Sequence, residues 1–327
     1  MEKREALFYE KLNGNVRCKL CPHECVISPG QEGFCWGRKN IDGKLYAVNY
    51  GEVVSIAIDP MEKKPLYHFY PGTEILSVAP NGCNLRCPYC QNYTISQERA
   101  RTEYISPEEL VQIARRYNSI GICFTYSEPL IWYEYIMDVA KIDRNMKIVL
   151  VTNGTINEEP FLQLAPCIDA MNIDLKSMDP EYYRKTLKGD LRTVLRTIEL
   201  AHENGIHVEV TNLLIPTIND SPQEIRKLVE WVASVSRKIP VHFTRYFPHY
   251  RWELPPTPME SLMRAYEIGK RYLDYVYLGN VWSETGNDTC CPSCGNLLVE
   301  RRGFYARVVG IQDGKCKKCG EKADFVL

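Results

Sequence analysis

Three cysteines within eight residues constrain this chain more than any other feature of its sequence. Cys83, Cys87 and Cys90 are separated by three and then two residues, and they follow the apolar, β-prone run 75–78 and a turn signal. The pattern indicates a metal loop at the end of a strand. Three thiolates hold three corners of a cubane iron–sulfur cluster, which leaves one iron open to an outside molecule. An open metal position is typical of catalytic sites, whereas structural sites are closed.

Length and charge set wide limits on what the chain can be. Its 327 residues are enough for one large domain and one or two small ones. Forty basic and 41 acidic residues give a net charge of −1, so we do not expect nucleic acid or an acidic lipid surface as a partner. The N-terminus has no apolar signal-peptide core, and no apolar run is long enough to span a bilayer. We therefore expect a cytoplasmic protein with no membrane partner.

Eight of the other eleven cysteines form two further groups, one near each end of the chain. Fourteen cysteines in a reducing compartment favour metal binding over a disulfide framework. The N-terminal group lies among glycine turns and predicts a small metal-tied module that binds either zinc or a second iron–sulfur cluster; its members are Cys18, Cys21, Cys25 and Cys35. The C-terminal group forms two knuckles about a predicted hairpin and predicts a zinc ribbon; its members are Cys291, Cys294, Cys316 and Cys319.

Strand and helix patterns alternate between residues 73 and 280. Helix-start signals stand at Ser106-Pro107 and Ser221-Pro222, and further helical stretches cover 181–200 and 258–273. This alternation predicts an α/β fold with a parallel sheet built from right-handed crossovers. Six or seven units are too few for a complete eightfold barrel, so we expect a partial, open (β/α)6-type barrel with chemistry at the C-terminal strand ends. The strand candidates are 75–79, 121–126, 147–152, 170–175, 207–215, 241–245 and 275–278.

Three modules follow from this reading of the chain. Residues 1–72 form a Cys-rich module with a short hairpin over 44–58, residues 73–280 form the core barrel, and residues 281–327 form the four-cysteine module. The segment from Asp59 to Gly72 mixes cations with aromatic residues between prolines. It is either a loop that faces a substrate or cofactor or a packed linker.

The central triplet resembles the cluster motif of the radical SAM superfamily. The resemblance covers residues 73 to 280 and implies a [4Fe–4S] cluster on the catalytic cysteines Cys83, Cys87 and Cys90. It also implies that S-adenosylmethionine (SAM) chelates the open iron, and that one electron cleaves SAM to methionine and a 5′-deoxyadenosyl radical. That radical takes a hydrogen atom from a substrate. Tyr89 matches the family's aromatic residue near the adenine of SAM.

Three strand-end segments extend the resemblance to SAM binding. Ser127-Glu128-Pro129 resembles the family's Gly-Gly-Glu-Pro segment, whose backbone and acid meet the methionine ammonium, although Tyr126 and Ser127 replace the glycines. Asn153 lies in a segment similar to one in the glycyl-radical-enzyme activases and implies contacts with ribose or carboxylate groups. Asp174 and Lys176 match the activases' Asp-Leu-Lys segment, which implies that Lys176 contacts the SAM carboxylate while Asp174 orders the site.

The layout of the whole chain resembles the AmmeMemoRadiSam-system radical SAM enzymes, which are related to pyruvate formate-lyase activating enzyme. That resemblance implies a radical SAM oxidoreductase, a low-potential electron donor, and MEMO-like and AMMECR-like proteins as candidate partners. The hydrogen donor is either a protein glycine or a small molecule. A different class of function is a multi-zinc binding module that docks nucleic acid or protein; the near-neutral charge and long α/β core count against it.

Overall fold

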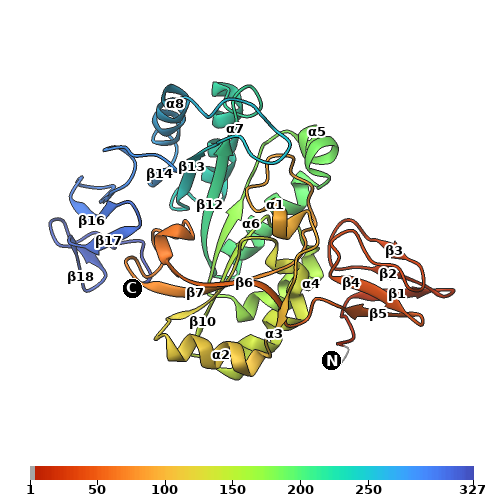
Figure 1. Ribbon diagram of the computed structural model, residues 1–327. Helices are drawn as coiled ribbons and strands as arrows, with labels where there is room; N and C mark the ends of the chain where they lie inside the picture. The colour runs from red at the N-terminus through yellow and green to blue at the C-terminus, as the bar shows by residue number, and fades with distance from the viewer. Residues whose placement is uncertain (1–3) are drawn as a thin grey trace. The chain divides into compact units, whose positions relative to one another are not determined.

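The computed structural model describes residues 4–327, which group into two compact units (Figure 1). The first unit comprises the chain up to Ile58 together with Ile75–Met171 and Asp179–Ile206. The second comprises Asp59–Glu74, Asn172–Met178 and His207–Leu327. The division into modules at residues 72 and 280 stays a prediction.

The first unit joins small antiparallel sheets to a parallel β/α core. A three-stranded antiparallel sheet and the β4–β5 hairpin precede the core; their strands are β1 (Tyr9–Leu12), β2 (Asn15–Cys18), β3 (Val26–Ile27), β4 (Arg38–Ile41) and β5 (Lys44–Ala47). In the core, β9 pairs in parallel with β7 and with β10; the strands are β7 (Glu74–Pro80), β9 (Gly121–Phe124) and β10 (Lys147–Thr152). The main helices are α2 (Pro107–Arg116), α3 (Tyr133–Ile142), α4 (Glu158–Leu164) and α6 (Leu191–Glu203).

The second unit repeats the parallel arrangement and ends in short antiparallel strands. β13 (Val241–Arg245) pairs in parallel with β12 (His207–Leu214) and β14 (Val276–Gly279), and α7 (Pro222–Val235) packs against α8 (Met259–Gly269). The C-terminal strands follow; they are β15 (Thr289–Cys290), β16 (Leu297–Arg302), β17 (Tyr305–Val308), β18 (Ile311–Gln312) and β19 (Lys315–Cys316). The boundary between the units falls within β11 (Ala170–Asp174).

The expected α/β fold with parallel strands is confirmed, and the strands described in residues 4–327 do not close into a barrel. β10 and β13 have the predicted bounds. Ser106 caps α2: its hydroxyl accepts from the Glu109 N–H, and the Glu109 carboxylate accepts from the Ser106 N–H. This reciprocal pair satisfies two backbone donors that a helix start leaves open.

One local prediction was wrong, and another held only in part. The 44–58 segment is not one hairpin: β5 pairs with β4 across Asp42-Gly43, and β6 (Glu52–Pro60) pairs with β8 (Glu103–Tyr104). The region predicted to be helical over 181–200 is helical over most of its length but is interrupted. α5 (Pro180–Tyr182) and a π-helical turn end at Lys188, whose φ of 59° is left-handed, and α6 starts afresh after an Asp190 cap.

The segment from Asp59 to Gly72 is a packed linker. Leu66, His68 and Phe69 are all buried. His68 Nδ1 donates to the Asp324 carbonyl at 2.7 Å, and its Nε2 accepts from the Tyr277 hydroxyl at 2.6 Å. This pattern uses the neutral tautomer with its proton on Nδ1. The second of the two alternatives for this segment is therefore correct.

Burial determines the charge state of His68. Desolvation lowers the pKa of His68 to about 3, and the nearby Arg301 and His207 also disfavour its charged form. The Glu209 carboxylate acts in the opposite direction, and it accepts a hydrogen bond from the His68 backbone N–H at 2.7 Å.

The described residues contain no helix long and apolar enough to cross a membrane.

The buried His68 should make stability fall on acidification. The native pKa of about 3 lies below the ordinary 6.5, so the unfolded chain binds the extra proton as pH falls through 6.5 towards 3. Wild-type unfolding free energy should therefore drop by roughly 2 kcal/mol more than that of His68→Gln between pH 7 and pH 5. Urea unfolding followed by circular dichroism measures both slopes. Exposed His202, replaced by Gln, is the control and should leave the wild-type slope unchanged. Equal slopes for wild type and His68→Gln would contradict the assignment.

Candidate functional site

The cysteine loop begins where β7 ends, and its entry needs glycine. Gly82 has a φ of +109°, and a Cβ there would lie 2.3 Å from the Cys35 carbonyl oxygen. Any side chain at this position would both strain the backbone and displace the N-terminal segment. The Gly82 N–H donates to the carbonyl of Ile95, near the end of the short α1 helix (Tyr93–Ser96), at 2.8 Å.

None of the three loop cysteines forms a disulfide, and their surroundings suit metal-bound sulfur. Cys83 Sγ accepts from the Leu85 N–H at 3.3 Å and from Asn153 Nδ2 at 3.6 Å, while Cys90 Sγ lies 3.1 Å from Ser96 Oγ. Hydrogen bonds to cluster sulfurs are among the means by which a protein sets cluster potential. Burial, followed by the Glu128 charge, raises the pKa of the Cys83 thiol well above its usual 9.0. These residues fit an iron–sulfur cluster, which would bind the deprotonated sulfur.

Arg86 fixes the shape of the loop from its outer side. Its guanidinium donates to the Cys83 carbonyl at 2.7 Å and to the Phe34 carbonyl, and it lies 3.8 Å from the centre of the Phe34 ring. The Arg86 backbone N–H donates to Leu187 O at 2.8 Å. The loop is therefore held against the N-terminal module by charge-assisted bonds as well as by packing.

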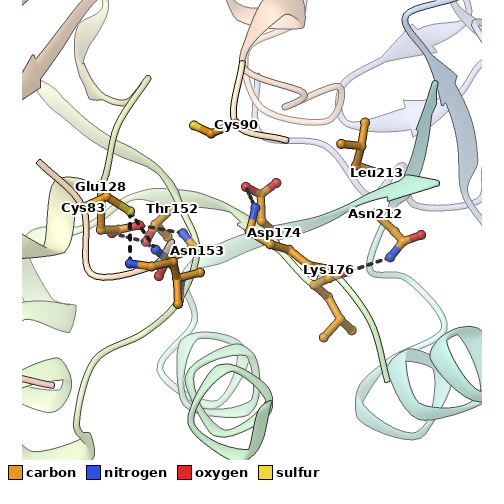
Figure 2. Close-up of polar contacts among 12 residues, drawn as sticks. Cys83, Cys90, Glu128, Thr152, Asn153, Asp174, Lys176, Asn212 and Leu213 are labelled. Atoms are coloured by element: carbon orange, nitrogen blue, oxygen red, sulfur yellow. Dashed lines mark hydrogen bonds and ion pairs between the residues drawn. The ribbon is translucent and has the colours of Figure 1, made fainter. Parts of the chain in front are cut away.

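Glu128 joins the ends of two parallel strands. Its carboxylate is 1% exposed and accepts from the Leu130 N–H at 2.9 Å, the Thr152 hydroxyl at 2.6 Å and the Asn153 N–H at 2.8 Å (Figure 2). Leu130 lies in the helical turn Pro129–Trp132 that follows β9, and Thr152 ends β10. The predicted acid is thus a buried anchor with at least three donors, and the structure places predicted Asn153 beside it.

Asn153 continues this network to the cysteine loop. Its Nδ2 donates to Asn84 Oδ1 at 2.9 Å as well as towards Cys83, and its Oδ1 accepts from the Thr155 N–H at 2.9 Å. Asn84 donates to the Thr155 carbonyl at 2.8 Å. Sequence reasoning missed Asn84 and Thr155. The only local signal was that Asn84 adjoins a proposed ligand.

Tyr126 adopts a backbone conformation that favours glycine. Its φ is 65°, in the left-handed region, and its carbonyl accepts from Asn92 Nδ2 at 2.7 Å. The neighbouring Ser127 donates from its hydroxyl to the Pro80 carbonyl at 2.6 Å. The side chain of predicted Ser127 is therefore engaged with the end of β7.

Tyr89, between the last two cysteines, is buried. Burial raises the pKa of Tyr89 well above its usual 10.0, and proximity to Cys87 and a hydrogen bond with Tyr182 act in the same direction. The ring therefore stays a neutral phenol within the loop.

Asp174 and Lys176 lie in the second unit and pair with each other. Lys176 Nζ is 2.8 Å from Asp174 Oδ2, and both side chains are partly exposed (Figure 2). Two asparagines that sequence reasoning missed hold the backbone around this pair. Asn212 Nδ2 donates to Leu175 O at 2.7 Å, and Asn219 Nδ2 donates to Lys176 O at 2.8 Å.

The C-terminal cysteines form a compact metal-type group. The sulfurs of Cys291, Cys294, Cys316 and Cys319 all lie within 4.8 Å of one another. Two of these pairs, Cys291–Cys319 and Cys294–Cys316, are 3.7 Å apart. This group can hold a metal ion.

The N-terminal cysteines are brought together more loosely. The four of them line one cavity, together with His23, Arg38 and Asn84. No three of them have their sulfurs within 4.8 Å of one another, since within residues 4–327 the C-terminal group alone meets that spacing.

Known proteins are similar to this chain over its core and, in one case, over its full length. Residues 77–232 match the radical SAM superfamily. An uncharacterized protein of Methanocaldococcus jannaschii is 48% identical over 335 residues, which cover 99% of this chain and all of that protein. A probable GTP 3′,8-cyclase of Archaeoglobus fulgidus is 32% identical over 47% of this chain and 53% of its own length. Pyruvate formate-lyase-activating enzyme of Clostridium pasteurianum is 25% identical over 47% and 67%. The chain thus spans one of these three relatives fully and the other two in part.

Solved structures agree on the fold. A radical SAM methyltransferase from Sphaerobacter thermophilus aligns with a TM-score of 0.52 at 18% identity, over 70% of this chain and 71% of that one. Residues 77–232 of this chain are therefore a radical SAM domain.

Loss of the Glu128 charge should loosen the two strand ends. In Glu128→Gln, an NH2 group replaces one carboxylate oxygen and cannot accept a hydrogen bond, so either the Asn153 N–H or the Leu130 N–H loses its acceptor. We expect a loss of about 2 kcal/mol in unfolding free energy and faster hydrogen exchange in peptides covering 152–157. Glu108→Gln, an exposed change in the first turn of α2, is the matched control. Unchanged exchange in Glu128→Gln would contradict the anchoring role.

Proposed function

We propose that this chain is a radical SAM oxidoreductase whose catalytic [4Fe–4S] cluster binds Cys83, Cys87 and Cys90. The cluster and SAM together supply a 5′-deoxyadenosyl radical by one-electron cleavage of the sulfonium, and the radical takes a hydrogen atom from the substrate. The protein holds the loop, orients SAM and excludes competing hydrogen donors.

The Cys83–Asn153–Glu128 network is the observation that carries this proposal. It connects a free thiol of the triplet to the ends of β9 and β10 through buried hydrogen bonds. The open ends of parallel strands are where α/β folds place chemistry. Glu128 and Asn153 therefore act as positioning residues for the loop, and the strand ends around them are the proposed SAM-binding surface.

The remaining SAM contacts are proposed from the family resemblance. They are the ring of Tyr89, the backbone at Ser127, the amide of Asn153 and the Asp174–Lys176 pair. A cationic Lys176 suits the SAM carboxylate because ammonium–carboxylate bonds are charge-assisted.

Two substrate classes are supported by the names of the relatives. An enzyme that activates pyruvate formate-lyase acts on a protein, whereas a GTP 3′,8-cyclase acts on a nucleotide. We propose hydrogen abstraction from a protein glycine or from a small molecule, with a low-potential electron donor as a partner. MEMO-like and AMMECR-like proteins are the first candidates to test as further partners, because the chain layout resembles the systems that contain them.

We also propose that the C-terminal group binds a structural zinc. Four thiolates at about 2.3 Å around one tetrahedral ion lie roughly 3.8 Å apart. The sulfur separations of 3.7 Å in this group match that geometry. A closed four-cysteine site leaves no position for substrate, so its role is to hold the terminal strands together.

SAM cleavage tests the main proposal. Anaerobically reconstituted protein, reduced chemically in the presence of SAM, should release 5′-deoxyadenosine. Cys87→Ala should reduce the yield to background, because the triplet loses one of its three cluster ligands. Cys167→Ala, an isolated cysteine outside the three groups, is the matched control and should keep the wild-type yield. Unchanged cleavage in Cys87→Ala, or a wild-type protein that binds zinc but no iron, would overturn the proposal. Deuterium transfer from labelled candidate substrates into 5′-deoxyadenosine then identifies the hydrogen donor.

Metal analysis tests the zinc site. Wild-type protein should contain about one zinc ion per chain, and Cys294→Ser should contain none, because three thiolates no longer close the tetrahedron. Its C-terminal segment should also become sensitive to protease, since metal binding and folding are coupled. The neighbouring Cys290 is exposed and lies outside the group, so Cys290→Ser is the control and should keep its zinc. Zinc retained in Cys294→Ser would contradict the assignment.

A further inference from the structure

The N-terminal cysteine cavity is the strongest feature that the catalytic loop does not explain. Cys18 ends β2, Cys21 and Cys25 follow in the turn before β3, and Cys35 lies in the next glycine turn. Backbone bonds hold these turns: the Cys18 N–H donates to Cys25 O at 3.0 Å, and the Glu24 N–H donates to Cys21 O at 3.1 Å. All four thiols are free. Four free thiols that face one cavity are more than simple packing requires.

The distance between cysteine sulfurs distinguishes a site for a single zinc ion from a site for a cubane iron–sulfur cluster. A single zinc ion draws four sulfurs to about 3.8 Å from one another. In a cubane cluster each thiolate binds a different iron, so the cysteine sulfurs stand farther apart. The C-terminal group has zinc spacing, whereas no three sulfurs in either the N-terminal group or the catalytic triplet lie within 4.8 Å. Among the described residues, the N-terminal group and the triplet therefore both lack the close sulfur spacing of a single-ion site.

The walls of the cavity suit an anionic, oxygen-sensitive group. Its lining is chiefly apolar and includes Leu20, Ile27 and Phe34. Arg38, 1% exposed, also lines it and pairs with equally buried Glu134 at 2.8 Å, yet its Nε has no hydrogen-bond partner among the described residues. The free space is about 20 Å³. Iron–thiolate bonds are shorter than van der Waals contacts, so a covalently held group needs less free space than a loosely bound ligand.

The cavity adjoins the catalytic loop through direct contacts within the first unit. His23 and Asn84 both line it, and His23 Nε2 donates to the Asn84 carbonyl at 2.7 Å. Asn84 is the residue after Cys83, and the Cys35 carbonyl touches Gly82 on the other side. The two cysteine groups are therefore separated by little more than one layer of backbone.

From these observations we infer that Cys18, Cys21, Cys25 and Cys35 bind an auxiliary [4Fe–4S] cluster that passes electrons to the catalytic cluster. All four irons have a protein ligand, so this centre has no open position for SAM. One electron enters from a reduced low-potential protein donor and leaves to the catalytic cluster, and no bond forms or breaks in the N-terminal module. The assignment of a cluster to these four cysteines does not depend on the catalytic cluster, whereas its role as an electron relay rests on the proposed function.

Iron analysis in a variant without the catalytic triplet tests the cluster. The triple variant Cys83→Ala/Cys87→Ala/Cys90→Ala, reconstituted anaerobically, should keep about four iron and four sulfide ions per chain, against about eight of each in the wild type. A further Cys18→Ala/Cys21→Ala change should remove the rest, while Cys167→Ala should remove none. Circular dichroism confirms that each variant is folded.

The outcomes separate this inference from the proposed function. A folded triple variant that contains additional zinc instead of iron, or no metal beyond the C-terminal ion, overturns the auxiliary cluster. A Cys18→Ala/Cys21→Ala variant that has no iron in its intact triplet overturns the catalytic cluster instead. The iron content of each centre is therefore measured in a variant that lacks the other centre.

Electron paramagnetic resonance tests the relay. Fully reduced wild-type protein should show signals broadened by magnetic coupling between two neighbouring centres. Each variant with a single cluster should show the narrow signal of an isolated one. A wild-type spectrum equal to the sum of the two variant spectra would overturn the relay role.

Discussion

The buried carboxylate of Glu128 is the interaction on which the site depends. A carboxylate removed from water loses several kcal/mol of hydration, so it persists only where donors replace that water. Here the donors come from the end of β10 and from the turn after β9, while the next side chain, Asn153, reaches Cys83. One charge therefore aligns two strands and, through a neighbour, a thiol of the cysteine loop. Its removal would disturb all three together.

The cysteine loop is also shaped by the N-terminal module. Gly82 lies against Cys35, and Arg86 bonds to carbonyls on both sides of this contact. Solvent exposure and hydrogen bonds to sulfur are the main protein controls on cluster potential. Residues more than 40 positions upstream thus help to set the environment of the loop. This physical coupling is a reason for one chain to keep both cysteine groups.

The sequence predicted where strands and helices lie in the core better than it predicted which strands pair with each other. Short apolar runs between turn signals located β10 and β13, and local capping chemistry located α2, because these signals act within a few residues. Strand pairing at 44–58 was wrong because alternation shows a strand but not its neighbour. The helix after Glu181 breaks where Gly189 packs against Leu85, a contact 104 positions apart that no local pattern contains.

Local patterns also failed to predict those contacts of the site that join distant segments. The cysteine groups, Glu128 and Asn153 were proposed from motifs, whereas Asn84 and Thr155 were missed because their roles arise only from contacts between distant segments. Tyr126 shows a different case, in which a residue other than glycine holds a left-handed backbone conformation. A left-handed tyrosine costs about 1 kcal/mol or more relative to glycine. Bonds from Asn92 to its carbonyl and from Ser127 to Pro80 hold that conformation. The strand end therefore keeps its shape because neighbouring contacts, and not the residue's own preference, determine it.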